Sequence, residues 1–126
     1  MNRFSDKVAL VTGGRSGIGC AIAQRLQQEG ARVFTAQRQV DHQFESVVAD
    51  LADTGVPQQL INEVIDRAGA LHVLVNNAGV MLEGNARECS LEQWQTTLAV
   101  NLTAPFLLIK HALPHLQRGS AIVNVG

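Results

Sequence analysis

Glycines fall at four of the seven positions from 13 to 19, directly after the apolar run 7–12 and before residues at helical spacing. Glycine permits a tight turn at Gly13, a close ligand approach at Gly17 and close helix–strand packing at Gly19. Free N–H groups and the dipole at a helix N-terminus favour a pyrophosphate. This context predicts a dinucleotide site, with a ligand-free turn as the alternative. We expect phosphate contacts from Gly13, Ser16, Gly17, Ile18 and Gly19, with Arg15 also among the cofactor-binding residues.

The second strand ends on Gln37 and Arg38, at the position where an NAD site carries a carboxylate against the ribose, about 20 residues past the glycines. No carboxylate stands here to repel a 2′-phosphate, and the Arg38 guanidinium could pair with one. The pattern favours NADP over NAD as the cofactor. The alternative is that Arg38 is a solvated loop charge.

Pro105 follows Asn101 by four residues, and proline has no N–H. The Asn101 carbonyl therefore loses its helical partner, which predicts a kinked helix. A freed carbonyl that faces a pocket can hold a water, whereas one that faces solvent marks a plain kink. His111 and His115 have a spacing at which two imidazoles could share a metal, but no third ligand is evident, so we predict no metal site.

Short apolar runs alternate with helical patterns along the chain. The first helix carries Ile18, Ile22 and Leu26 and is stopped by Gly30, and the second ends at Gly69. There is no room for a full helix between the second and third strands. Alternation predicts right-handed crossovers and a Rossmann-type, doubly wound parallel sheet of order 3-2-1-4-5. The five predicted strands are Lys7–Thr12, Arg32–Ala36, Ser46–Ala49, Leu71–Val75 and Ser120–Val125.

A long helix is expected over about residues 90–118, opened by a capping box of Ser90 and Gln93. Two apolar stripes run along it, which indicates burial on two sides. One side can cover the sheet. The other needs a second helix, from this chain or from another subunit, so helix 90–118 is our candidate surface for a homo-oligomer.

The composition is that of an ordinary soluble domain, with 126 residues, 46% hydrophobic residues and 17% charged residues. We expect one domain over residues 1–126. The net charge of −1 gives no reason to expect nucleic acid or an anionic membrane as a partner. No continuous apolar run approaches the ~20 residues of a membrane span. With two unpaired cysteine positions and no signal-peptide pattern, we expect a reduced, cytoplasmic setting.

Five motifs together resemble the short-chain dehydrogenase/reductase family. Thr12–Gly19 is similar to its TGxxxGIG turn, and residues 76–79 to its NNAG segment. The resemblance implies adenine contacts from Asp50 and Leu51, a ribose contact from Asn77 with Ala78 and Gly79 beside it, and a proton-relay role for the Asn101 carbonyl. Residues 122–126 resemble the strand that leads to the family's catalytic serine. The implied reaction is hydride transfer between a nicotinamide and a small-molecule carbonyl or secondary alcohol.

The family's Ser and Tyr-x-x-x-Lys would follow Gly126, where the chain ends, and the chain contains no tyrosine. We therefore expect the incomplete, cofactor-binding N-terminal half of an NAD(P)-dependent oxidoreductase, inactive by itself. A non-catalytic nucleotide-binding or dimerising module is the second hypothesis. Neither hypothesis names a substrate.

Overall fold

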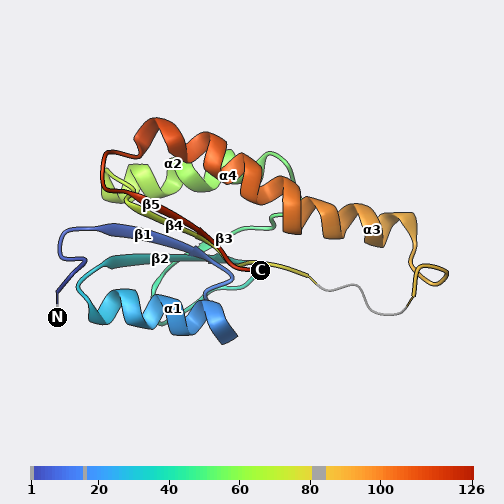
Figure 1. The fold of residues 1–126 in the computed structure, drawn as a ribbon, viewed down its shortest axis with the longest axis horizontal. Helices are drawn as coiled ribbons and strands as arrows, with labels where there is room; N and C mark the ends of the chain where they lie inside the picture. The colour runs from blue at the N-terminus through green and yellow to red at the C-terminus, as the bar shows by residue number, and fades with distance from the viewer. Residues whose placement is uncertain (1, 16, 81–84) are drawn as a thin grey trace.

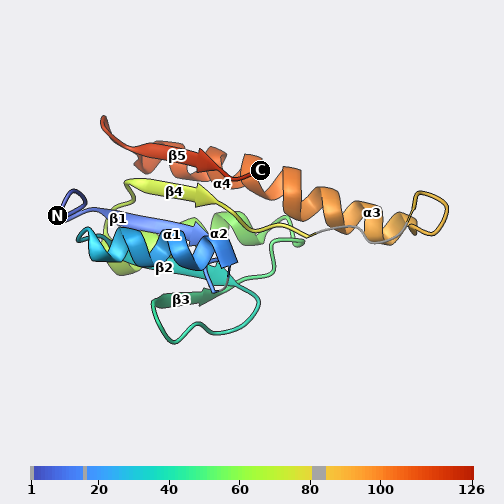
Figure 2. The same cartoon turned by 60° about the horizontal axis from the view of Figure 1, so that its bottom comes forward.

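A computed structural model of the chain describes residues 2–15, 17–80 and 85–126. It contains one parallel sheet of order β3-β2-β1-β4-β5, as predicted, and Figure 2 shows the strands side by side. The observed bounds lie within two residues of the predicted ones at each end. The strands are β1 Val8–Thr12, β2 Arg32–Gln37, β3 Glu45–Val48, β4 Val73–Asn76 and β5 Ala121–Asn124.

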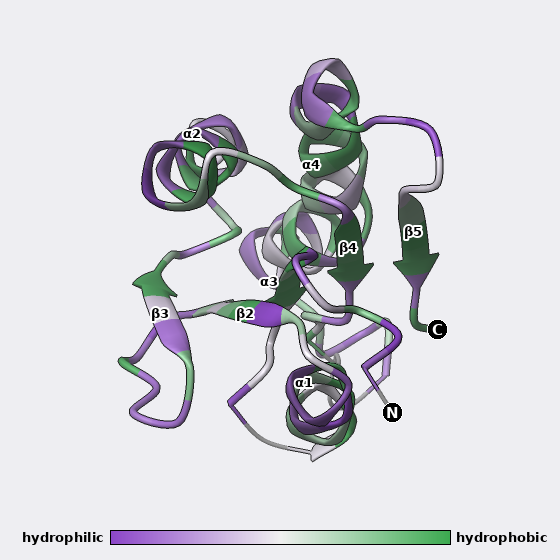
Figure 3. Cartoon of the chain, turned by 90° about the vertical axis from the view of Figure 1, so that its left-hand side faces the viewer, coloured by the Kyte–Doolittle hydropathy of each residue, from purple (hydrophilic) through white to green (hydrophobic). Residues whose placement is uncertain are grey.

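Helices cover both faces of this sheet, as in a doubly wound fold. Helix α1 (Gly17–Gln28) lies on one face, and α2 (Val56–Ala68) and α4 (Ala104–Ala112) lie on the other (Figures 1 and 3). Helix α3 (Leu91–Leu98) extends beyond the sheet and has no buried residue (Figure 1). Helix α2 begins with Pro57 in its first turn and ends at Gly69, whose φ of 75° is the left-handed cap that glycine favours.

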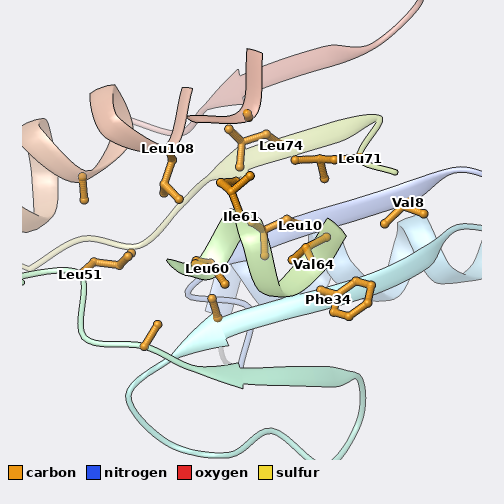
Figure 4. Packing of buried hydrophobic residues seen from close by; sticks show 14 residues of the cluster. Val8, Leu10, Phe34, Leu51, Leu60, Ile61, Val64, Leu71, Leu74 and Leu108 are labelled. Carbon is orange, nitrogen blue, oxygen red and sulfur yellow. The ribbon is translucent and has the colours of Figure 1, made fainter. Parts of the chain in front are cut away.

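Alternate residues of the central strands enter two separate cores, because both faces of the sheet are buried. Leu10 and Leu74 point toward α2 and α4, where they meet Leu60, Ile61 and Leu108 (Figure 4). The neighbouring residues of the same strands pack against α1 from the opposite face. Members of that second cluster include Ala9, Val11, Ala23, Leu26, Val33, Val73 and Val75.

The predicted helix 90–118 is one helical run from Leu91 to His115 with two irregular segments. A π-helical turn, η1 (Ala99–Thr103), separates α3 from α4, and a 3₁₀ turn, η2 (Leu113–His115), ends the run. The predicted end at residue 118 is wrong, because Leu116 adopts an extended conformation after Pro114. The capping box is confirmed: Ser90 Oγ accepts from Gln93 N at 3.1 Å, and Gln93 Oε1 accepts from Ser90 N at 2.9 Å.

One of the two apolar stripes of this run is buried and the other is exposed, as expected where the described residues supply no second helix to cover it. One stripe, with Val100, Ala104, Leu108 and Ala112, is buried against α2 and the sheet. The other stripe is exposed, because none of the described residues packs over it. Its exposed fractions are 69% for Leu91, 50% for Trp94, 66% for Leu102, 62% for Phe106 and 57% for Leu113.

The run 91–115 is also long and apolar enough to cross a membrane, by length and composition only. A count of continuous apolar residues misses it, because polar residues such as Gln95 and Asn101 interrupt the run. Averaged over 18 residues, the segment passes a test that the core helix of a soluble protein also passes. Within that window 22% of the residues are buried, and the buried stripe packs against α2 and the sheet.

Candidate functional site

The predicted site residues gather at the carboxyl ends of the strands, where the arrowheads of Figure 2 point. The turn after β1 faces the segment after β4, with the segment after β2 alongside. Helix α1 leaves β1 toward one face, and the chain after β4 leads to the helices of the other face (Figure 1). In open parallel sheets, ligands bind at this reversal of connection direction.

Three glycines of the turn serve three different geometric needs. Gly13 has a φ of 66°, and a Cβ there would lie 3.0 Å from the Cα of Ala78. A Cβ on Gly19 would lie 2.2 Å from the Gly13 carbonyl oxygen, so helix and turn touch. Gly17 has a φ of 58°, but a Cβ there would meet none of the described residues within 4 Å. The space in front of Gly17 is therefore open, as a phosphate site needs.

The backbone N–H groups of the turn are largely uncommitted. Gly13 N donates to the Ala36 carbonyl at 2.8 Å. Among the described residues, no acceptor outside α1 pairs with the N–H of Gly14, Arg15, Gly17 or Ile18. The first N–H groups of an α-helix also lack intrahelical partners, so the start of α1 presents free donors to an anion. Ser16, which the sequence also placed here, lies outside the described residues.

Ile18, one of the predicted phosphate-contact residues, lies at the site and not in the core. Helical spacing grouped it with Ile22 and Leu26, but its side chain is 64% exposed. It lines a cavity of about 520 Å³ with Asn77, Gly79 and Asn101. The first turn of α1 extends beyond the part of the helix that packs on the sheet, so Ile18 lies at the mouth of the site.

Thr12 joins the turn to the segment after β4, a role that its place at the start of the Thr12–Gly19 motif did not predict. Its buried hydroxyl accepts from Asn77 N at 3.1 Å and from Ala78 N at 3.0 Å. Asn77 Nδ2 then donates to the Gly13 carbonyl at 3.1 Å. A hydroxyl that ends an otherwise apolar strand was the available signal. These bonds fix Asn77, Ala78 and Gly79 beside the turn.

A second cavity, of about 420 Å³, lies between the ends of β1, β2 and β3 and the start of η1. Arg38, exposed, stands on one side, and the described residues provide it with no hydrogen bond or ion pair. On the other side, Asp50 accepts from Ala52 N at 3.0 Å, and Leu51 is buried in the core as well as lining the cavity. The predicted residues that line it are Gly13, Arg38, Asp50, Leu51, Ala78 and Gly79.

Arg15 points toward the chain after β2. Its Nη1 donates to Oε1 of Gln39, the residue next to Arg38. Two guanidinium groups, from segments 23 residues apart, therefore stand at the same loop. Such a pair suits a doubly charged anion.

Asn101 lies inside the π-helical turn, so the predicted kink takes the form of a local widening of the helix. Its side-chain Oδ1 accepts from Val80 N at 2.8 Å, and its Nδ2 donates to the Val80 carbonyl at 2.7 Å. The residue that an α-helix would pair with the Asn101 carbonyl is Pro105, which has no N–H. Turns of this kind occur often at functional sites. Asn101 thus ties the helix to the segment after β4.

Among the described residues, no group of three or more His, Cys, Asp or Glu side chains is placed so that it could hold a metal ion. His72 belongs to the sheet instead. Its Nδ1 accepts from Val8 N at 2.9 Å, at the end of the sheet opposite the site.

Comparisons with known proteins agree with this geometry. The family model for short chain dehydrogenases matches residues 7–126. The chain is 36% identical over 140 residues to 2,5-dichloro-2,5-cyclohexadiene-1,4-diol dehydrogenase LinX of Sphingobium indicum, covering 98% of this chain and 56% of that protein. This chain therefore spans about half the length of that relative.

Two solved structures superpose closely. A short chain dehydrogenase from Burkholderia cenocepacia in complex with NADP is 34% identical, with a TM-score of 0.92 over 99% of this chain and 57% of that chain. A blue fluorescent protein from a metagenomic library, in complex with NADPH, is 32% identical, with a TM-score of 0.92 over 100% of this chain and 57% of that one.

Proposed function

The chain belongs to the short-chain dehydrogenase/reductase family, and from this premise we propose that residues 1–126 form one domain that binds the dinucleotide of an NAD(P)-dependent oxidoreductase. The protein's reaction is then hydride transfer between a nicotinamide and a carbonyl or secondary alcohol. The bound dinucleotide would supply the hydride acceptor or donor. The residues described above would bind and orient it.

The open, donor-rich turn at the start of α1 is the observation that carries this proposal. Gly13 and Gly19 have steric reasons within the chain to be glycine. The open space at Gly17 is explained by a ligand that approaches there, next to unpaired N–H groups. Asn77 would contact the adenosine ribose, and Asp50 and Leu51 the adenine ring.

NADP is favoured over NAD on charge. The cavity beside β2 presents Arg38 and no carboxylate at the Gln37–Arg38 corner. Arg15 stands next to it through Gln39. A 2′-phosphate would gain charge-assisted bonds there. The NADP and NADPH complexes of the two structural neighbours support the same choice.

For Asn101 we propose a relay role. Its side chain is committed to Val80, which leaves the backbone carbonyl, without an α-helical donor, as the group that could hold a water. The polypeptide of residues 1–126 contains no tyrosine, the residue type that the family uses as proton donor. We therefore expect this polypeptide to bind cofactor without turning over a carbonyl substrate.

Two glycines make a matched test of the turn. Gly17 and Gly69 both have positive φ (58° and 75°) and open space where a methyl group would be added, so alanine at either position costs backbone strain of about 1 kcal/mol. Calorimetric titration with NADPH should show binding by wild type and Gly69→Ala, and at least tenfold weaker binding by Gly17→Ala, because its methyl occupies the phosphate's approach. Equal affinity of the two variants would remove the case for the turn.

The second candidate function, a non-catalytic or dimerising module, is favoured by the exposed stripe on 91–115, in which Leu91, Leu102 and Phe106 are each more than 60% exposed. Sedimentation of the same sample decides between them. A monomer that binds NADPH supports the first function. An assembly that binds no nucleotide and dissociates when Phe106 is changed to Lys supports the second.

A further inference from the structure

The connection from β2 to β3 is unusually short for two parallel neighbours. Residues 38–44 make it without a helix, whereas parallel strands ordinarily need a crossover of about a dozen residues or more. Figure 2 shows this loop swinging out below β3. A loop without regular structure must be held by side chains, and this one lies between the adenosine cavity and α1.

Asp41 is the buried anchor of the loop, with 6% of its surface exposed. Its Oδ2 accepts from Thr35 Oγ1 at 3.1 Å, and its Oδ1 accepts from Gln43 N at 2.9 Å. Its own N–H donates to Ser46 Oγ at 3.0 Å. One residue thus fastens the loop to β2 and to β3. A buried carboxylate is costly unless it is hydrogen-bonded, and here it meets neutral donors.

Thr35 connects Asp41 to the glycine turn. It is fully buried, and its methyl group lies where a Cβ on Gly14 would come within 2.5 Å. Its hydroxyl is the donor to Asp41. The same side chain therefore packs under the turn with one group and holds the loop with the other.

The exposed part of the loop carries Arg38 and contacts Arg15 of the glycine turn. Arg38 lines the cavity, and Gln39 accepts from Arg15 of the glycine turn. Further along, Gln43 Oε1 lies 3.7 Å from Cys20 Sγ of α1. The positions of the Arg38 and Arg15 side chains therefore depend on the position of loop 38–44.

We propose that Asp41 is a positioning residue for the cofactor's 2′-phosphate. By fixing loop 38–44 against Thr35 and the glycine turn, it keeps Arg38 and the Gln39-bound Arg15 on one side of the adenosine cavity. This inference rests on the proposed NADP function and assigns part of its specificity to a residue that touches no ligand.

The test uses two probes that differ in one group, 2′,5′-ADP and 5′-AMP, titrated into the whole chain. Wild type should bind 2′,5′-ADP more tightly. Asp41→Ala should weaken the binding of 2′,5′-ADP by about tenfold and the binding of 5′-AMP by less than about threefold. Without Asp41 the loop no longer holds the two arginines in place, and they lose charge-assisted bonds that only 2′,5′-ADP makes. Asp41→Asn should recover most of the difference, since its side-chain oxygen can still accept from Gln43 N.

Thr35 offers a matched pair in the same assay. Thr35→Val keeps a methyl under Gly14 and loses the hydroxyl, so it should follow Asp41→Ala. Thr35→Ser keeps the hydroxyl and should retain the wild-type ratio of affinities. An equal loss for both probes in Asp41→Ala, or a ratio that follows the methyl instead of the hydroxyl, overturns the positioning role. A wild type that binds neither probe overturns the proposed function together with this inference.

Discussion

At the scale of single residues, the two arginines of the site have different surroundings. Arg15 is oriented by Gln39, while Arg38 is exposed and, within the described residues, has no partner. An arginine held in place keeps its guanidinium at one location and loses less freedom when an anion binds. Arg38 is the group whose charge can be changed with the least effect on the fold.

Arg38→Asp should therefore reverse the cofactor preference. A carboxylate at this corner repels a 2′-phosphate and can accept from a ribose hydroxyl. We expect NADPH to bind about 10- to 100-fold more weakly and NADH to bind at least as tightly as in wild type, by calorimetric titration.

Arg118→Asp is the control for this change, because it alters the net charge equally at an exposed position that precedes β5, at the end of the sheet opposite the site. It should leave both affinities unchanged. If the two substitutions weaken NADPH alike, the effect belongs to overall charge and Arg38 has no specific role.

The sequence identified site residues whose role shows in the residues next to them along the chain, and it missed residues whose role depends on contacts made by folding. The glycine turn and Arg38 were predicted from their neighbours along the chain, and the Asp50–Leu51 pair from the family resemblance. Residues of all three line two adjoining cavities. Thr12 acts on a segment brought near by folding, because Asn77 lies 65 residues beyond it. Asp41 bonds to residues within six positions along the chain, but across a loop that has no regular structure. A hydroxyl or carboxylate gives no periodic signal of such a contact.

At the scale of elements, apolar runs and helical spacing located all five strands and their order. The irregular elements were harder to predict. Pro105 indicated that the helix must depart from regular geometry near Asn101, but not that it would widen into a π-helical turn. The stripes marked Leu102 and Phe106 as part of an apolar face that needs a partner, but a stripe does not say what covers such a face.

Two ion pairs join elements at the edges of the fold. Arg3, before β1, hydrogen-bonds the Glu29 carboxylate after α1 and holds its pKa below the ordinary value of 4.5. Arg32 Nη2 of β2 donates to Glu45 Oε1 of β3 at 2.8 Å, and this bond likewise lowers the pKa of Glu45. Both carboxylates are thus favoured in the charged form by folding.

Acid should therefore weaken the fold through these pairs. Because the folded-state pKa values lie below the unfolded ones, the stabilisation is present above about pH 5 and is lost as the pH falls through the folded values. Urea unfolding should show the free energy of unfolding dropping between about pH 5 and pH 3, with a smaller drop in the double variant Glu29→Gln, Glu45→Gln.

Glu92→Gln supplies the comparison, since the described part of the chain offers Glu92 no ion pair. This variant should follow the wild-type curve. A double variant that also follows the wild-type curve would show that the two pairs do not link folding to pH.

At the scale of the whole molecule, the sheet, α1 and the helices of the opposite face converge on one edge. The two cavities meet at Ala78 and Gly79, which line both, so one extended ligand could occupy them together. Adenosine recognition would lie toward β2 and β3, and the reactive half of a dinucleotide toward Asn101 and Val125. Leu91 and Leu113, which belong to the exposed stripe along 91–115, line neither of these two cavities.

In the proposed complex, the backbone N–H groups at the start of α1 receive the dinucleotide's charged bridge. Amide NMR spectra of the ¹⁵N-labelled chain, recorded during NADPH titration, test it directly. The largest shifts should fall on the amides of Gly14 to Gly19, with smaller ones near Arg38 and Asn77. Saturable binding that leaves those amides unmoved, or shifts confined to helix 91–115, would contradict the account.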